Sequence, residues 1–156
     1  MLRITKETDY GILVLTLFAK YGRDHVLTTK QVSQQSGIAY RMVCKLLNLL
    51  TRKGLLASYR GIRGGYYLLK QPSEITLEEA IEAIEGPIQL TQCTKKEYCD
   101  CMALEKCIVQ DHWAYINKVF REALQGVTLS SLANPLDESR FPFALNVKTI
   151  QAMGGN

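Results

Sequence analysis

The spacing of hydrophobic residues predicts two helices near the start of the chain. Residues 5–20 are apolar on nearly every face, a pattern typical of a buried helix, and Gly22 ends it. Thr28 and Gln31 have the spacing of a capping box, in which each side chain bonds the other residue's backbone amide. This pair opens a short helix that runs to about Ser36, and Gly37 makes the turn that follows.

A third helix is predicted over residues 39–53, because its apolar side chains recur at steps of three and four residues and so share one face. These side chains are Val43, Leu46, Leu47 and Leu50. The opposite face carries Arg41, Cys44, Lys45 and Asn48. Beyond Gly54, two β-prone runs at residues 55–59 and 66–69 enclose a basic, glycine-rich tip at residues 60–65, which predicts a hairpin.

Further along, helices are predicted on both sides of a cysteine-rich loop. After a break at residues 71–73, Thr76 and Glu79 repeat the capping-box pattern and open a helix that ends near Glu85. A long helix is predicted over residues 103–125. Apolar side chains follow it in alternating steps of four and three: Val109, Trp113, Ile116, Phe120, Ala123 and Val127. This stripe is suited to pairing with a second helix, but its repeats are few, and the alternative is packing on its own domain.

Charge divides the chain near residue 70. Residues 1–70 contain twelve Lys or Arg against three acids and carry +9, whereas residues 71–156 carry −5. A basic half is typical of nucleic-acid binding, because neutralised phosphates release their counterions. The longest apolar run, residues 11–19, is too short to cross a bilayer and follows acidic residues, so we expect no membrane association and a cytoplasmic protein.

Together these elements predict a mainly α fold with a small β-hairpin wing, that is, a winged helix-turn-helix followed by a long C-terminal dimerisation helix. We expect residues 1–72 to form a DNA-binding domain and residues 73–133 to hold the cysteine loop and the dimerisation helices. Residues 134–156 lose the hydrophobic periodicity, so we expect a flexible tail there.

The third helix and the wing are the expected DNA-binding surface. A major groove admits one helix, and we expect Arg41 to read guanine while its neighbours contact base edges or phosphates. Glycines tether the wing arginines closely, so these can reach the backbone or a narrow minor groove. The predicted set is Thr28, Tyr40, Arg41, Lys45, Asn48, Arg60 and Arg63. The alternatives are a solvated basic helix or a protein-interaction module, and the charge of +9 argues against the latter.

Four of the five cysteines lie within 15 residues, and in a cytosolic chain such a cluster favours metal or redox chemistry over structural disulfides. They are Cys93, Cys99, Cys101 and Cys107. Thiolates suit iron-sulfur clusters and zinc, but no Cys-x-x-Cys pair is present, which makes zinc and thioredoxin-like chemistry less favoured. Three nearby lysines favour the thiolate form, which serves a metal site or a thiol switch equally.

Several motifs resemble the Rrf-type winged-helix iron-sulfur regulators, in the IscR-like and NsrR-like branches. The matching segments are residues 2–5, Asp9-Tyr10, Gly37-Ile38, residues 60–66, Thr91-Gln92-Cys93, Cys99, Lys106-Cys107 and Trp113. The resemblance covers about residues 1–133, and it is strongest to the regulators of Suf-type iron-sulfur assembly operons. The wing motif together with a triple-cysteine loop makes it specific.

The resemblance implies a homodimer that crosses its long C-terminal helices, binds imperfect palindromes of double-stranded DNA, and holds an iron-sulfur cluster. Of the two cluster types in the family we expect 2Fe-2S rather than 4Fe-4S. Three loop cysteines are the implied ligands, with either Cys99 or Cys101 in the middle. The fourth ligand varies in the family, and the candidates are Asp9, Cys101 and His112, since Gln110 occupies the usual histidine position.

We therefore expect a transcription regulator, with DNA and a second copy of the chain as its partners, that senses iron-sulfur status or redox or nitric-oxide stress. A thiol-disulfide switch repressor without a cluster is the first alternative. An enzyme or electron carrier is the second, and the sequence offers neither a nucleotide-binding glycine fingerprint nor a Ser/His/Asp constellation in its support.

Overall fold

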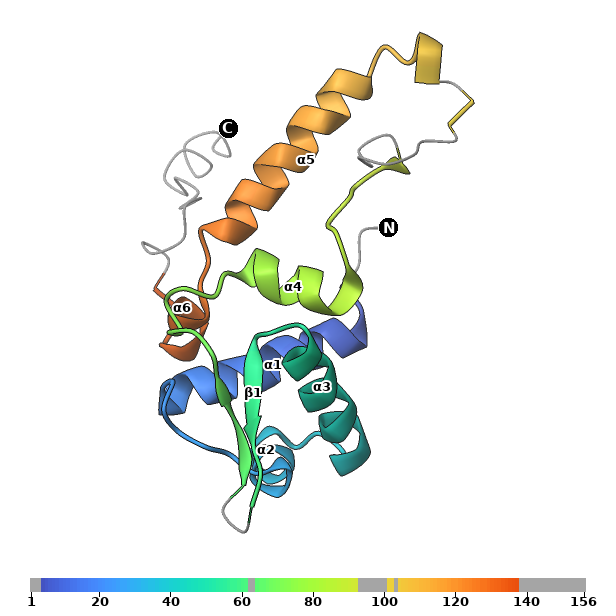
Figure 1. Cartoon of the computed structure of the whole chain (residues 1–156). Coiled ribbons are helices and arrows are strands. Elements are labelled where there is room, and N and C mark those ends of the chain that lie inside the picture. The colour runs from blue at the N-terminus through green and yellow to red at the C-terminus, as the bar shows by residue number, and fades with distance from the viewer. Residues whose placement is uncertain (1–3, 62–63, 93–100, 103, 138–156) are drawn as a thin grey trace, which may run out of the picture.

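The computed structural model describes residues 4–61, 64–92, 101–102 and 104–137 (Figure 1). In chain order the elements are α1 (Lys6–Tyr21), α2 (Thr29–Ser36), α3 (Tyr40–Arg52), β1 (Leu56–Tyr59), β2 (Gly65–Leu68), α4 (Leu77–Glu85), η2 (Leu104–Lys106), α5 (Gln110–Gln125) and α6 (Leu129–Ala133). This mainly helical fold with a two-stranded hairpin confirms the predicted fold class. The predictions for Arg63, Cys93, Cys99 and the tail from residue 138 lie outside the described residues.

Helix α1 begins and ends where the sequence predicts. The Thr5 hydroxyl caps its first turn by accepting a hydrogen bond from the Thr8 backbone amide, and Gly22 ends the helix. Val14, Leu15 and Phe18 are fully buried, but Leu13 is 45% exposed. The expectation that the helix is buried is therefore wrong for one side, because α2, α3, α4, α6 and β2 cover only the others.

Helices α2 and α3 form the predicted helix-turn-helix. The capping box is present, with Thr28 and Gln31 bonding each other's backbone amides, and Gly37 adopts a left-handed φ of 71° that allows the sharp turn. Four apolar residues of α3 are fully buried, as predicted: Val43, Leu46, Leu47 and Leu50. They form the centre of the hydrophobic core with residues of α1, β1 and β2.

Strands β1 and β2 pair antiparallel as the predicted wing, with Leu56 opposite Leu68 and Tyr59 opposite Gly65. The hairpin is also tied to the segment before α2, since Leu27 and Tyr66 exchange two backbone hydrogen bonds of 2.9 Å. A Cβ atom at Gly65 would lie 2.6 Å from the Leu27 carbonyl oxygen, so this close approach requires glycine. The base of the wing is therefore fixed to the body of the fold.

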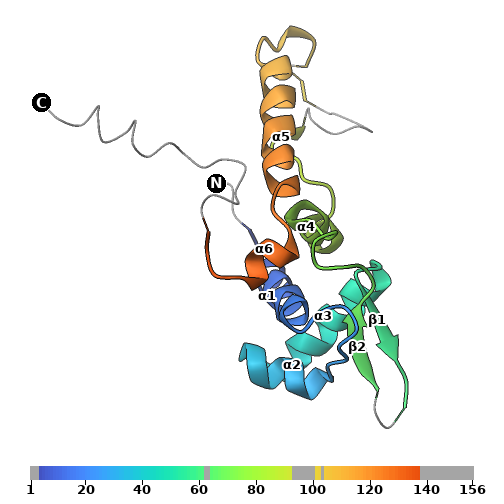
Figure 2. The same cartoon turned by 90° about the vertical axis from the view of Figure 1, so that its left-hand side faces the viewer.

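Helix α5 projects away from the winged-helix body, at the end opposite the wing (Figure 2). Polar side chains attach it to the rest of the chain. Arg121 Nε donates to Glu78 Oε1 of α4 over 2.5 Å, and Asn117 Oδ1 accepts from the Leu90 backbone amide over 3.0 Å. The carboxylate of Glu78 is nearly buried, and its hydrogen bond raises the pKa of Arg121 above the ordinary value.

The apolar stripe of α5 lies beside these attachments, and its residue Phe120 lines a hollow with Ile81 of α4 and Leu90. Val109, Trp113, Ile116 and Phe120 are each 38–45% exposed. Within the described residues, the chain's own domain therefore covers these side chains only in part, and the choice between the two alternatives stays a prediction. Only Val127, which lies beyond the end of α5, is buried.

Three details of the C-terminal part differ from the prediction. Helix α5 begins at Gln110 rather than residue 103, and a 3-10 turn, η2, precedes it. Met102 and Ile108 are almost fully exposed, so no burial stabilises an earlier start.

The Thr76 hydroxyl caps α4, but the Glu79 carboxylate accepts from Lys70 and does not complete a capping box. Helix α6 is absent from the sequence prediction, and it packs against α1.

Within the described residues, no helix is both long enough and apolar enough to span a membrane.

Candidate nucleic-acid interface and cysteine segment

The face of α3 opposite the core presents polar side chains in a row. Arg41, Lys45 and Asn48 are all exposed, and Tyr40 at the start of the helix is 55% exposed. The apolar face of α3 is fully buried, so its packing fixes which side chains point outward. Cys44 differs from the prediction because it is half-buried, between the two faces.

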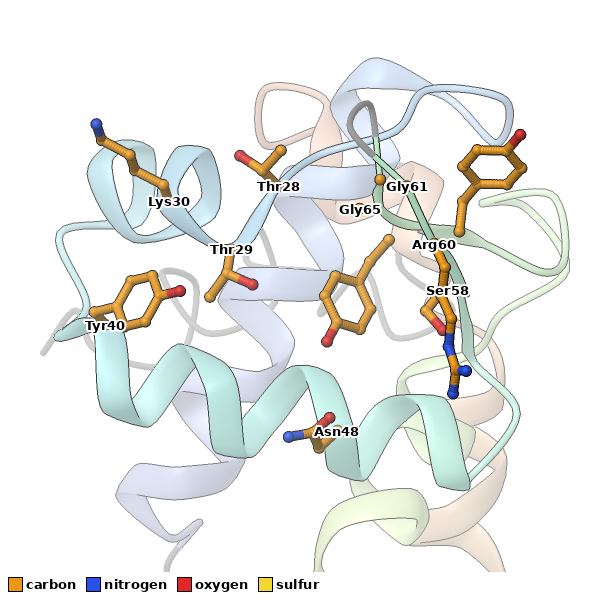
Figure 3. A pocket seen from close by; sticks show the side chains of 12 residues that line it. Thr28, Thr29, Lys30, Tyr40, Asn48, Ser58, Arg60, Gly61 and Gly65 are labelled. Carbon is orange, nitrogen blue, oxygen red and sulfur yellow. The ribbon is translucent and has the colours of Figure 1, made fainter.

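A hollow of about 600 Å³ lies between this helix, the start of α2 and the wing (Figure 3). Tyr40 and Asn48 of α3 line one side, and Ser58 and Arg60 of the wing line another. The remaining lining residues are Thr28, Thr29, Lys30, Tyr59, Gly61, Gly64, Gly65 and Tyr66. The structure thus brings four of the predicted contact residues, Thr28, Tyr40, Asn48 and Arg60, to one concave, polar surface.

The amino end of α2 opens onto this hollow. Thr28 is exposed there, but its hydroxyl lies 2.9 Å from Gln31 Oε1 and also accepts from the Gln31 amide, so its first role is to cap the helix. Thr29 and Lys30 follow it on the rim, and the prediction missed both. The capping box could have identified them, because the first turn of a helix offers free amides to a phosphate.

Lys45 does not line the hollow and instead pairs with α1. Its Nζ atom lies 2.7 Å from Glu7 Oε2, and the two side chains are 61% and 31% exposed. Glu7 belongs to the first turn of α1, 38 residues earlier in the sequence. No local pattern in the sequence indicates this contact.

The segment between α4 and α5 is here called the cysteine segment. Its described part contains two free, half-buried thiols, Cys101 and Cys107. Asp9 is exposed in the first turn of α1, and His112 is exposed near the start of α5. No group of three or more metal-ligating side chains occurs among the described residues. The predicted ligand set of Cys93, Cys99, Cys101, Cys107 and Asp9 therefore stays a prediction.

The segment is anchored at both of its ends. On the amino side, the backbone amide of Ile88 donates to Glu82 of α4 and that of Leu90 donates to Asn117 of α5. On the carboxyl side, the backbone amide of Gln110, the first residue of α5, donates to the Cys107 carbonyl over 3.4 Å. The described ends of the segment thus contact both α4 and α5.

The last residue of α4, Glu85, connects that helix to the start of α1. Its Oε1 atom accepts from the Thr8 hydroxyl and from the Thr5 backbone amide, the latter over 3.0 Å. These hydrogen bonds, that of Thr8 first, lower the pKa of Glu85 below its ordinary value of 4.5. Gly11, one turn further along α1, packs between Ile84 of α4 and Leu46 of α3. The first turns of α1 therefore contact both the helix that leads to the cysteines and the helix of the predicted DNA surface.

Comparison with known proteins identifies relatives over most of the chain. The Rrf2 family, described as iron-dependent transcriptional regulators, matches residues 4–135. The HTH-type transcriptional regulators IscR of Yersinia enterocolitica and of Serratia proteamaculans are both 28% identical over 136 residues, which are 87% of this chain and 82% of theirs.

Solved structures share the fold. CymR, the global cysteine regulator of B. subtilis, superposes with a TM-score of 0.68 and 28% identity, covering 88% of this chain and 100% of its own. T. potens IscR superposes with a TM-score of 0.64 at 19% identity, covering 99% and 93%. An oxidized form of Staphylococcus aureus CymR has a TM-score of 0.62 at 23% identity, covering 87% and 99%.

These relatives are transcription regulators and not enzymes, and the match extends over the helix-turn-helix, the wing and α5. The chain belongs to the Rrf2 family of DNA-binding winged-helix transcriptional regulators.

Proposed function

We propose that this regulator binds an operator through the exposed face of α3 and the wing, and that the cysteine segment controls its affinity. The observation that carries this proposal is the path of contacts between the two regions. Both ends of the cysteine segment bond to α4 or α5, and Glu85 joins α4 to the turn of α1 that pairs with Lys45. Different states of the cysteines could favour different arrangements of α4 and α5, and α1 would pass the change on to α3.

The exposed row on α3 supports the DNA-binding part of the proposal. A guanidinium can bond both major-groove acceptors of a guanine, so we assign this contact to the exposed Arg41, whereas Lys45 is suited to a phosphate. Tyr40, Asn48, Thr28 and the wing arginines Arg60 and Arg63 complete the contact set. Arg41→Ala should cost about 1–3 kcal/mol at one base position, and Lys45→Ala should mainly change the salt dependence of binding. A footprint that neither variant changes would contradict the assignment.

The exposed stripe of α5 supports a homodimer. Its members recur in steps of four, three and four residues, from Val109 through Trp113 and Ile116 to Phe120, as in helices that pair along a seam. We propose that a second copy of the chain covers this stripe. A two-fold dimer would place two α3 helices on one duplex, so the operator should be an imperfect palindrome.

We further propose that the cysteines hold an iron-sulfur cluster, which when bound supplies a centre sensitive to oxidants and nitric oxide. Cys93, Cys107 and either Cys99 or Cys101 would be its thiolate ligands, with Asp9, Cys101 or His112 as the fourth donor. The free, half-buried thiols of Cys101 and Cys107 and the exposed carboxylate of Asp9 fit this donor chemistry. On the resemblance to Suf-type regulators, the target genes would encode iron-sulfur assembly proteins.

Anaerobic purification tests the cluster and its coupling to DNA together. We expect a coloured protein that contains iron and sulfide, and Asp9→Ala and Cys101→Ala should identify the fourth ligand through their absorption spectra. Loaded and metal-free protein should differ in affinity for promoter DNA of iron-sulfur assembly genes at matched ionic strength. Equal affinities would show that the cysteine segment does not control binding.

A thiol switch is the second candidate, and the likeness to CymR favours it. Cys99 or Cys101 would lose two electrons and two protons with Cys93 or Cys107 to an added oxidant and form a disulfide. A protein that stays free of iron after reconstitution, and whose DNA affinity changes on oxidation and recovers with a dithiol, would support this candidate over the cluster.

A further inference from the structure

We propose that Glu7 restrains Lys45, so that the lysine adds less to DNA affinity than its exposure would allow. The inference rests on the proposed DNA-binding surface, because it assigns Lys45 to a phosphate. The pair is the 2.7 Å contact between Lys45 Nζ and Glu7 Oε2. Among ion pairs between described residues, it is the one that involves a residue of the predicted contact set.

Both partners are held on rigid elements. Lys45 lies between Val43 and Leu46 of α3, whose side chains are fully buried. Glu7 lies in the first turn of α1, where Thr5 caps the helix and the buried Thr8 bonds Glu85. The helix N-terminus also favours a negative side chain at that position. The two backbone positions are therefore fixed, and the carboxylate stays within reach of the lysine.

Charge at this point has a direct effect on phosphate binding. Residues 1–70 contain twelve basic residues and only three acidic ones. One of these three, Glu7, forms an ion pair with Lys45 of α3. A phosphate that approaches Lys45 has to displace the Glu7 carboxylate or accept its repulsion. Either event reduces the counterion release that the lysine would otherwise contribute. Glu7 should therefore lower the affinity for DNA of any sequence. Contacts with base edges should then supply a larger share of the binding energy.

The test is a double-mutant cycle, Glu7→Gln and Lys45→Ala, on the full-length protein with a labelled duplex of mixed sequence. We expect Glu7→Gln to bind roughly two- to fivefold tighter, the range that an exposed ion pair allows. The plot of log affinity against log salt should become steeper by up to about 0.9 for each protomer on the duplex. In the Lys45→Ala background, Glu7→Gln should have almost no effect.

Glu122→Gln is the matched control. It removes the same charge from another exposed pair, Glu122 with Lys118 on α5, far from α3. Its salt slope should equal that of the wild type, and circular dichroism should show that all variants remain folded. Unchanged or weaker binding by Glu7→Gln, an equal gain without Lys45, or an equal gain from Glu122→Gln would each overturn the inference.

Lys45→Ala alone separates this inference from the proposed surface. If Lys45→Ala flattens the salt slope while Glu7→Gln changes nothing, the surface stands and only the restraint by Glu7 is wrong. If Lys45→Ala leaves the slope unchanged in both the wild-type and the Glu7→Gln background, Lys45 contacts no phosphate, and both its place in the contact set and the inference are overturned.

Discussion

Helices α3 and α5 carry similar apolar stripes, but only one of them is covered. The stripe of α3 recurs in steps of three and four residues and is fully buried by the core. In the stripe of α5, four side chains at steps of four, three and four residues are each 38–45% exposed: Val109, Trp113, Ile116 and Phe120. The chain holds α5 through hydrogen bonds of Arg121 and Asn117, which lie beside the stripe.

The difference shows that hydrophobic periodicity identifies a face of a helix but not what covers it. For α3 the chain itself supplies the cover, so its apolar residues should determine the stability of the protomer. For α5 the described residues leave the stripe partly exposed, and on the proposed dimer a second copy covers it, so its apolar residues should determine association. Each of the following predictions tests one side of this contrast.

The largest effect on folding is expected at α3. Leu46→Ala should lower the free energy of unfolding by about 2–5 kcal/mol, because it leaves a cavity among fully buried side chains. Chemical denaturation followed by circular dichroism measures this loss. Leu13→Ala, at an exposed position on α1, is the control and should cost less than about 1 kcal/mol. Similar losses for the two variants would contradict the assigned core.

A large effect on association is expected at α5. Ile116→Asp places a charge in the centre of the stripe and should weaken a dimer by at least about 2 kcal/mol, or roughly 30-fold, while the protomer remains folded. Sedimentation equilibrium measures the change. Tyr115→Asp is the matched control, because this neighbouring residue is 68% exposed and lies off the stripe. A dimer that survives Ile116→Asp would show that the stripe is not the seam.

The smallest effect is expected at the hydrogen bonds between α4 and α1. Hydrogen bonds from Thr8 and Thr5 hold the pKa of Glu85 below 4.5, so the ionised carboxylate stabilises the fold above that pH. This contribution should disappear as the pH falls through the lowered pKa. Thermal melts between about pH 3 and pH 7 should show Glu85→Gln below the wild type at neutral pH, with the two converging in acid. Parallel curves across that range would count against the hydrogen bonds.

The elements that the sequence predicts well are those with local signals. Thr28 and Gln31 lie three residues apart, so their capping box can be predicted from the sequence alone. The period of α3 and the glycines of the wing are equally local. For the candidate site, such local signals are enough to predict four residues of the hollow between α2, α3 and the wing.

Contacts between distant segments could not be predicted in the same way. Glu7 and Lys45 are 38 residues apart, and Thr5 and Glu85 are 80 residues apart. Helix α6 is only five residues long and depends on distant partners, since the backbone amide of Leu129 donates to the Ile75 carbonyl and its side chain is fully buried. A helix this short is not stable by propensity alone. Its existence follows from the packed fold and not from its own residues.

The two hydrogen bonds between Leu27 and Tyr66 have a consequence for the shape of any bound duplex. They fix the base of the wing to the helix-turn-helix. The distance from α3 to the base of the hairpin should therefore be the same on every operator. On the proposed interface, adjustment between one operator and another would then fall to the DNA. Base steps that bend or narrow easily would be selected at positions that no side chain touches.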